Sequence, residues 1–361
     1  MSSTPDGPAM HLIDDWDHER PWDAAGVYAV APGVLRIPLP LPDDGLKAVN
    51  VYILDDADGP VLIDSGQALS NSQHQLGAGL AELGHRLSDV QRFLVTHVHR
   101  DHYTQAVSMR RELGTHISLG SGEQPSVRTV REPGIDRVAA QLELLVTCGA
   151  RELADRNRGF DDGLPADLWE DPDQWLVHGD VVSHGLRRLD VLETPGHTRG
   201  HVVFRDRAAA LLFAGDHILP RITPSIGFEP AVTPLPLRDY LDSLRLILSY
   251  DDTWLLPAHG PVTQSVHHRA NQLLEHHAER LTASLGHVDA DHRTALEVAH
   301  QLRWTRHARA LDDMSPVDQM LAVLETKAHL DVLVHRKRLN VHVEVDTGFA
   351  YYASTSSTSD L

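Results

Sequence analysis

Four side chains that can bind a metal ion lie within the six positions of segment 97–102, which reads HVHRDH. The segment directly follows a short apolar run. On a tight turn at the end of a strand, His97 and His99 can point towards one centre while Asp101 and His102 turn towards a second. This spacing suits two cations about 3.5–4 Å apart, as used in two-metal hydrolysis. The alternative is a histidine-rich surface loop, which is disfavoured because three later segments repeat the pattern.

Each of these later segments ends an apolar run with another side chain that can bind a metal. A Pro-Gly pair forces a turn directly before His197 in the sequence TPGHTRGH. Asp216 ends the sequence FAGD, and His259 lies in the sequence LLPAHG. Because each of these residues follows a short strand, one edge of a sheet sandwich could gather all of them.

The composition excludes several other kinds of site. The chain has 361 residues, 25 histidines and one cysteine, Cys148, so neither an internal disulfide nor a cysteine-rich metal site can form. Cys148 lies on the apolar side of an expected helix and is predicted to be packed. Neither G-x-S-x-G nor H-E-x-x-H occurs, and the glycines around Ser121 have the wrong spacing for a nucleophile elbow. The formal net charge of −19 repels phosphate backbones and anionic membranes.

The elements that must position these side chains are short strands first, followed by alternating strands and helices. This order predicts α/β layering. The expected strands are Val27–Val30, Val34–Pro38, Val49–Leu54, Pro60–Ile63, Phe93–Val95, Leu189–Glu193, Val202–Arg205, Ala209–Phe213 and Thr253–Leu256. The expected helices of this part are Ala68–Leu87, Ile135–Cys148 and Leu237–Ser249.

Composition and pattern divide the chain into four regions. Residues 1–25 form a polar N-terminal segment, and residues 26–262 form the catalytic domain, with a helical insertion at about 121–179. Residues 263–353 contain three helical patterns and a hairpin, the layout of a winged helix. The Ser/Thr-rich tail 354–361 is expected to be disordered. The C-terminal elements are expected at His268–Leu285, Thr294–Trp304, Pro316–His335, Val341–Val345 and Phe349–Tyr352.

No apolar run of the sequence is long enough to cross a bilayer. The longest, Ala208–Ala214, has seven residues, whereas about 20 are needed. The N-terminus has neither the basic region nor the apolar region of a signal peptide. A cytoplasmic location without a membrane partner is therefore expected.

The order of the motifs HxHxDH, TPGHT, Gly-Asp and Pro-Ala-His-Gly closely resembles the metallo-β-lactamase-fold hydrolase superfamily. Segment 61–66, VLIDSG, is similar to the early LIDSG element of that family. The resemblance covers roughly residues 25–262 and implies an αββα sandwich with a binuclear metal site along its edge. Residues Leu324–Leu330 and the following hairpin resemble the winged-helix extension of one subgroup. Some members of that subgroup look like thioester hydrolases, and one branch cuts RNA.

The resemblance also implies roles for individual residues. Two divalent ions, zinc first with iron or manganese as alternatives, suit imidazole and carboxylate ligands without thiolate. They would lower the pKa of a shared water and produce a bridging hydroxide that attacks a polarised carbonyl. Asp101 is a candidate to hold the proton of the nucleophile after attack, and Asp216 is the second catalytic carboxylate. The implied ligands are His97, His99 and His197 for one metal, Asp101, His102 and His259 for the other, and Asp216 as the bridge.

Several neighbours of these residues have two interpretations each. Asp64 either orients a ligand imidazole or is a plain turn carboxylate. His201 is expected to be structural or to support a ligand, and His217 to point away from the site. Tyr103 stands where many family members have a small residue; it is either packed or donates its hydroxyl to a developing oxyanion. The histidines expected to have no role are His116, His178 and His184, with His276 and His277 solvated on a helix outside the core.

We expect a hydrolase that cleaves an ester-like acyl bond of a small molecule, a thioester or a lactone. The apolar, proline-stiffened segment Ile218–Ile226 could line the mouth of an acyl pocket or be a packed loop. The alternative is a nuclease or another nucleic-acid-processing hydrolase. A diiron redox protein fits less well, because those relatives replace the second histidine of HxHxDH with a carboxylate.

Nucleic acid is disfavoured as a partner on charge grounds. Residues 262–353 contain ten Lys/Arg against twelve Asp/Glu, and Arg336–Arg338 is their one tight basic cluster. The third helix of this region is apolar along Met320, Val323, Leu324 and Leu330. This face predicts packing on the catalytic domain or on a second copy in a homodimer.

Overall fold

The computed structural model describes residues 21–41, 45–132, 134–159, 164–288, 293–305 and 307–355. Most of the predicted polar N-terminal segment, and most of the tail predicted to be disordered, therefore lie outside the described residues.

Seven strands form the first sheet, in the order in which they occur along the chain. The first four pair antiparallel, and the later pairs are parallel. The strands are β1 (Tyr28–Ala31), β2 (Val34–Pro40), β3 (Ala48–Leu54), β4 (Val61–Ile63), β5 (Arg92–Val95), β6 (His116–Gly120) and β7 (Gln174–Leu176).

Five strands form the second sheet, in the order β12-β11-β10-β9-β8. The pair β11 and β12 is parallel, and the other pairs are antiparallel. The strands are β8 (Val181–His184), β9 (Arg187–Glu193), β10 (Val202–Asp206), β11 (Leu211–Gly215) and β12 (Trp254–Pro257).

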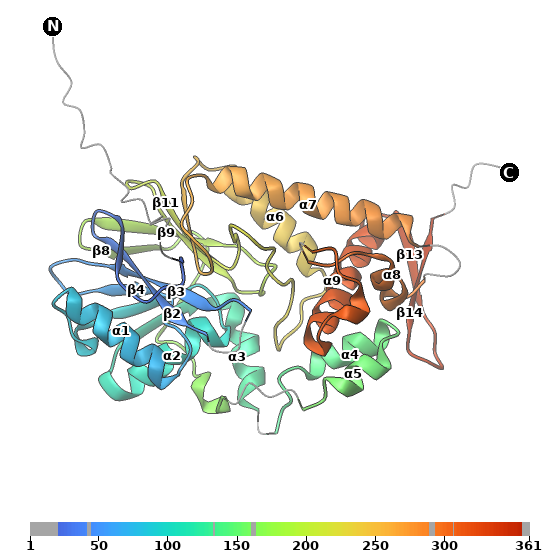
Figure 1. Ribbon diagram of the computed structural model, residues 1–361, viewed down its shortest axis with the longest axis horizontal. Helices are drawn as coiled ribbons and strands as arrows, with labels where there is room; N and C mark the ends of the chain where they lie inside the picture. Colours follow the sequence, from blue (N-terminus) through green and yellow to red (C-terminus); the bar gives the residue numbers. More distant parts are fainter. Residues whose placement is uncertain are drawn as a thin grey trace, which may run out of the picture.

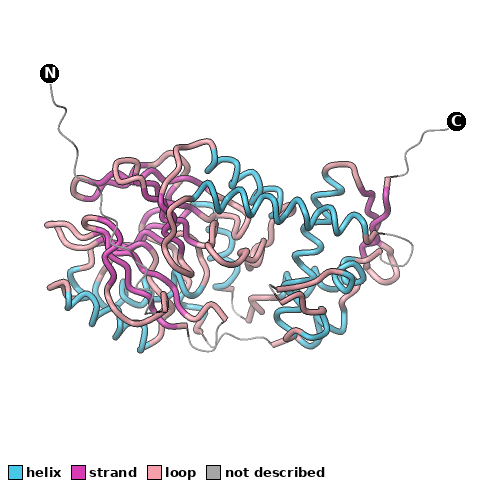
Figure 2. Tube along the Cα trace, turned by 45° about the horizontal axis from the view of Figure 1, so that its top comes forward, coloured by secondary structure: helices cyan, strands magenta, loops and turns pink. Residues whose placement is uncertain are grey.

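The two sheets pack face to face, with helices on both outer faces (Figures 1 and 2). Strand β3 is buried on both of its faces, because Val51 packs under the helices of the first outer layer while Tyr52 packs between the sheets. The helices of the first outer layer are α1 (Ser70–Glu82) and α2 (Arg100–Leu113). Those of the second are α6 (Pro236–Leu248) and α7 (Val266–Gly286). This arrangement confirms the predicted αββα sandwich.

The predicted strands recur in the structure with small shifts, and three helices are shorter than expected, the third being Ala295–Gln301 where Thr294–Trp304 was expected. Helix α1 ends before Gly84, whose positive φ of 83° breaks the helical backbone. Helix α4 starts at Ala139 rather than Ile135. The Asp136 side chain accepts the backbone N–H of Val138 at 3.0 Å and closes a turn there instead.

The predicted helical insertion, residues 121–179, is helical only in its first part. Its last residues form β7, which pairs with β6 and extends the first sheet. A strand of only three residues gives too short an alternation to be seen in the sequence. The helices of the insertion are α3 (Gln124–Arg131), α4 (Ala139–Thr147) and α5 (Arg151–Arg156).

The C-terminal region contains helices α7, α8 and α9, followed by a two-stranded hairpin (Figure 1). Its core is α9, which packs against α6 of the sandwich and against α4 and α5 of the insertion. The elements after α7 are α8 (Ala295–Gln301), α9 (Pro316–His335), β13 (Leu339–Val343) and β14 (Ala350–Ser354). Both hairpin strands lie about two residues from their predicted positions. The layout agrees with the expected elements, and the winged-helix assignment itself stays a prediction.

Within the described ranges, no helix combines the length and the apolar composition that crossing a bilayer requires.

Candidate metal centre

The carboxyl ends of several strands from both sheets meet at one edge of the sandwich. His97 and His99 follow β5, and His197 lies in the loop between β9 and β10. Asp216 follows β11 and His259 follows β12, two neighbouring parallel strands. The backbone N–H of Val202 donates to the carbonyl of Thr96 at 2.8 Å and joins the loops of the two sheets. Local strand ends, rather than one continuous segment, therefore bring the predicted residues together.

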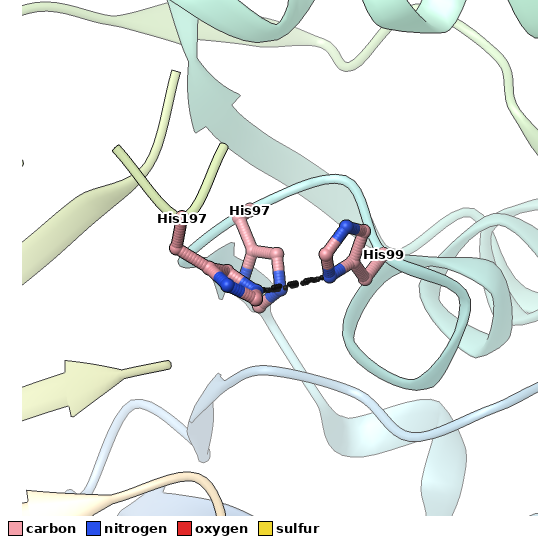
Figure 3. A group of neighbouring side chains, drawn as sticks. All are labelled: His97, His99 and His197. Carbon is pink, nitrogen blue, oxygen red and sulfur yellow. Dashed lines mark hydrogen bonds between the residues drawn. The ribbon is translucent and has the colours of Figure 1, made fainter. Parts of the chain in front are cut away.

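His97, His99 and His197 form the first group of converging side chains (Figure 3). Nε2 of His197 lies 3.2 Å from Nε2 of His97 and 3.0 Å from Nδ1 of His99. Nε2 of His97 lies 3.0 Å from Nδ1 of His99. Nitrogens bound tetrahedrally to zinc at 2.0–2.1 Å are about 3.3 Å apart, so the observed spacing is close to that of a zinc triad.

The surroundings of this first group favour neutral imidazole rings. Burial, together with the neighbouring imidazoles, lowers the pKa of His97 well below its ordinary value. Burial and the nearby His197 lower the pKa of His99 to about 3, and burial also lowers the pKa of His197. A neutral imidazole keeps one lone pair, which is the form that binds a metal.

Asp101, His102 and His259 form the second group, and all three are buried. Oδ2 of Asp101 lies 3.5 Å from Nε2 of His102 and 3.3 Å from Nε2 of His259. Burial lowers the pKa of His259, but the carboxylates of Asp216 and Asp101 raise it well above its ordinary value. The negative charge of this group therefore favours a cation.

Asp216 lies between the two groups and turns a different oxygen towards each. Its Oδ2 is 3.5 Å from Nε2 of His197 in the first group. Its Oδ1 is 3.3 Å from Nε2 of His259 and 3.7 Å from Nε2 of His102 in the second. Burial opposes its ionisation, yet His259 and His102 lower the pKa of Asp216 well below its ordinary value. The geometry is that of a bridging carboxylate.

The second group and Asp216 contain buried polar atoms that have no hydrogen-bond partner among the described residues. A buried polar atom without a partner costs free energy, so several in one place call for an unseen ligand. The donor set of nitrogen and oxygen without sulfur suits a first-row divalent ion. The residues present thus fit two metal ions. The atoms are Oδ2 of Asp101, Nε2 of His102, Oδ1 of Asp216 and Nε2 of His259.

Each histidine of the two groups is fixed in orientation by a hydrogen bond at its other ring nitrogen. Such outer contacts select the tautomer and direct the free lone pair into the site. The contacts are His97 Nδ1 to Thr96 Oγ1 (3.1 Å), His99 Nε2 to the Phe228 carbonyl (2.8 Å), His102 Nδ1 to Asp64 Oδ2 (2.9 Å), His197 Nδ1 to the Ser225 carbonyl (2.7 Å) and His259 Nδ1 to the Ala48 carbonyl (2.7 Å).

Asp64 supports one histidine in each group. Its carboxylate accepts from Nδ1 of His102 and from the hydroxyl of Thr96, and that hydroxyl oxygen contacts Nδ1 of His97. Asp64 is buried and has a positive φ of 61°. Of the two interpretations offered by the sequence, the geometry favours a residue that orients ligand imidazoles.

His201 belongs to neither group and contacts the backbone of Asp216 instead. Its Nε2 accepts the backbone N–H of Asp216 at 3.2 Å, and its Nδ1 contacts Oγ1 of Thr194 at 2.9 Å. A Cβ at Gly215 would lie 2.7 Å from Nε2 of His201, so only glycine allows this approach.

Two further neighbours are packed residues. The hydroxyl of Tyr103 donates to the Glu170 carbonyl at 2.5 Å, and the ring is buried, so it offers no donor to the site. His217 is buried against the ring of Tyr240, with centroids 5.3 Å apart, and joins neither group. Cys148 is buried, as predicted, and burial raises its pKa to about 12.

The prediction that His276 and His277 are solvated is wrong. His276 is half-buried, and His277 is fully buried with its Nδ1 3.1 Å from Nε2 of His329 on α9. Helix α9 covers this face of α7, a contact between distant segments that the helical pattern could not reveal. His184, expected to have no role, is also buried and contacts the Leu54 carbonyl.

The sequence reasoning missed the supporting residues of the site. Thr96 and the carbonyls of Ser225 and Phe228 hold ligand rings, and the buried carboxylates Glu123 and Glu229 lie behind the loops that carry them. The prolines of the segment after Asp216 are the one sequence signal near these carbonyls. Nothing local marks Glu123 or Glu229.

The chain matches the model of the metallo-beta-lactamase superfamily over residues 44–259, which is more than half of its length. A probable metallo-hydrolase, YqjP, of Bacillus subtilis is 25% identical over 87% of this chain and 95% of its own length. An atrochrysone carboxyl ACP thioesterase of Aspergillus fumigatus is 24% identical over 75% of this chain and 71% of its own length.

Two solved structures resemble nearly the whole molecule. A metallo-beta-lactamase family protein from Thermus thermophilus has a TM-score of 0.72 and 27% identity, over 90% of this chain and 99% of that one. A beta-lactamase domain protein from Burkholderia ambifaria has a TM-score of 0.71 and 26% identity, over 92% of this chain and 96% of that one. Because both structures match at least 90% of this chain, the similarity includes most of the region after residue 259. Motif order, fold and these matches together place the chain in the metallo-beta-lactamase superfamily, whose members are metal-dependent hydrolases that use divalent ions, typically zinc.

Proposed function

We propose that this chain is a binuclear metal-dependent hydrolase that cleaves an ester-like acyl bond, with a thioester as the first candidate and a lactone as the second. The observation that carries the binuclear part is Asp216, whose two oxygens face two separate ligand groups. Zinc is the metal we expect, because imidazole and carboxylate ligands suit it, although they also suit iron and manganese.

The protein groups would divide the work as follows. His97, His99 and His197 would hold one ion, while Asp101, His102 and His259 hold the other. The ions would supply a Lewis acid for the substrate carbonyl and acidify a water molecule. Asp101, at the edge of the second group, is the candidate to hold the proton released from the nucleophile.

The acyl substrate class rests on two supports. One relative carries the name of an acyl-carrier-protein thioesterase, and it matches three quarters of this chain. The segment after Asp216 also borders the site, because the carbonyls of Ser225 and Phe228 contact His197 and His99. The same segment carries two exposed apolar side chains, Ile222 and Val232. Exposed apolar side chains on a segment that borders the site suit an acyl chain better than a phosphodiester.

A matched substrate series tests this proposal. The zinc-loaded protein is given a medium-chain acyl thioester, the oxoester and the lactone of similar chain length, and a nitrophenyl phosphodiester. We expect kcat/KM to be highest for the thioester or the lactone, and to fall to background when the metal is removed by a chelator. Faster turnover of the phosphodiester would overturn the acyl assignment. Activity that survives chelation would overturn the metal-dependent mechanism.

The weak binding of nucleic acid is a separate prediction. The most basic cluster, Arg336–Arg338, consists of three exposed residues at the turn between α9 and β13. Non-specific binding needs several phosphate contacts, and each adds about 0.9 to the slope of affinity against salt. Helix α9 packs against α4, α5 and α6, so its apolar face is not available to enter a groove of RNA or DNA. We expect dissociation constants weaker than micromolar for RNA and duplex DNA at about 150 mM salt.

Fluorescence anisotropy with labelled RNA and DNA measures this binding, with the variant R336A/K337A/R338A as the control. Sub-micromolar binding that disappears in the triple variant would favour the nuclease alternative. Equal, weak binding by both proteins agrees with an acyl hydrolase.

A further inference from the structure

Two buried carboxylates, Glu123 and Glu229, lie behind the first ligand group. Their exposed fractions are 0% and 2%, and neither belongs to a metal-ligand group among the described residues. Burial and the carboxylate of Glu229 raise the pKa of Glu123, and burial raises that of Glu229. Burying two carboxyl groups together costs free energy. Their hydrogen bonds are therefore expected to have a role beyond satisfying the two groups themselves.

Glu123 connects the two loops that carry the first group. Its Oε1 accepts from the hydroxyl of Thr198, which directly follows the ligand His197. The backbone N–H of Val98, which lies between the ligands His97 and His99, also interacts with this carboxyl group and favours its ionised form. One side chain therefore joins the segments of all three ligands, although these segments are about a hundred residues apart in the sequence.

Glu229 connects the same loop to the segment whose carbonyls orient the ligand rings. Its Oε2 accepts the backbone N–H of Arg199 at 3.0 Å and the hydroxyl of Ser126 at 3.2 Å. Its Oε1 accepts from the hydroxyl of Thr233 at 3.0 Å. The residue directly before it, Phe228, provides the carbonyl that contacts His99.

The backbones around Glu123 approach each other closely. A Cβ at Gly200 would lie 2.1 Å from the backbone nitrogen of Glu123, so this contact requires glycine. The loop of His197 thus lies directly on the short 3-10 turn Ser121–Glu123, and the carboxylate completes the contact.

We propose that Glu123, supported by Glu229, is a positioning residue that sets the spacing of the His97, His99 and His197 nitrogens for the first metal ion. It acts through the hydrogen bond from the Thr198 hydroxyl and through its interaction with the backbone N–H of Val98, and it does not touch the metal. What it supplies is an acceptor oxygen at a fixed place between the two loops. The proposal concerns metal binding alone, and a different substrate class would leave it standing.

Two variants of similar length separate the acceptor role from mere volume. E123Q keeps one acceptor oxygen, whereas E123M fills the space without one. We expect E123M to bind the metals about 10–100-fold more weakly in a chelator competition, which is the usual effect of losing an outer partner of a ligand. The cobalt-substituted E123M protein should also show altered visible absorption bands. E123Q should restore both the affinity and the spectrum. Wild-type affinity and spectrum in folded E123M would overturn the proposal.

A second pair keeps the test decisive if E123M fails to fold. T198V removes the hydroxyl that donates to Glu123 and preserves the shape of the side chain. T326V is its control, because Thr326 is equally buried and its hydroxyl donates to the Ala322 carbonyl, within α9. We expect T198V to weaken metal binding and to change the cobalt spectrum, and T326V to change neither. Equal behaviour of the two variants would contradict the positioning role.

Discussion

Replacing Asp216 with alanine is expected to lower the metal content from two ions per chain to one or none and to abolish most of the hydrolytic activity. The carboxylate turns Oδ2 towards the first group and Oδ1 towards the second, so its loss weakens both. A bound metal contributes several kcal/mol to catalysis, and each 1.4 kcal/mol is a factor of ten. We therefore expect the rate to fall about a thousandfold or more. Elemental analysis of the fully loaded protein and an acyl-thioester assay measure the two effects.

Asp206→Ala is the matched control for this variant. Asp206 is as deeply buried as Asp216, but it belongs to neither metal group. Its Oδ2 instead pairs with Nη1 of Arg187 at 2.6 Å. Its loss should lower the melting temperature without changing the metal content. Two ions retained in Asp216→Ala would contradict the bridging role, and a single ion in the loaded wild type would contradict the binuclear centre. Metal loss in both variants would point to unfolding instead.

The residues that converge at the proposed site could be selected from the sequence because most of them closely follow the end of a strand. Pairing within the sheet fixes the place of a strand's carboxyl end. A residue that follows this end closely is therefore also confined to that edge of the sheet. Asp216 directly follows β11, whereas His97, His197 and His259 come two to four residues after β5, β9 and β12, and the structure brings all four to one edge. The sandwich itself was predictable for the same reason, since short apolar runs alternate with turn signals and helical patterns.

What the sequence could not show are contacts between segments that lie far apart. Glu123 meets Thr198, and His277 meets His329, across gaps that no local periodicity spans. A glutamate in a short turn after a strand and a histidine on a polar helix both look solvated until the covering element is known. The three residues of β7 are too few to display alternation, so an edge strand looked like part of a helical insertion.

Replacing His259 with alanine is expected to leave the fold intact and to lower the hydrolytic rate about a hundredfold or more. Its Nε2 is 3.3 Å from both Asp101 and Asp216, and it is the one histidine that β12 contributes to the second group. The turn that carries it keeps other contacts, because Nδ2 of Asn50 donates to the carbonyls of Pro257 and Gly260. Circular dichroism tests the fold, and the thioester assay tests the rate.

His184→Ala separates the lost ligand from the lost packing. His184 is also a buried histidine bonded to a main-chain carbonyl, that of Leu54, whereas His259 contacts the carbonyl of Ala48. In the presence of a chelator, each variant gives up one buried hydrogen bond of about 1 kcal/mol. His259→Ala also leaves the buried carboxylates of Asp101 and Asp216 without the imidazole that they face, so it should lose more thermal stability than His184→Ala. When zinc is added, stabilisation depends on the affinity of the folded state for the ion, so the rise in melting temperature should be smaller for His259→Ala alone. An unchanged rate and an unchanged zinc response in His259→Ala would mean that this histidine only holds its turn against β3.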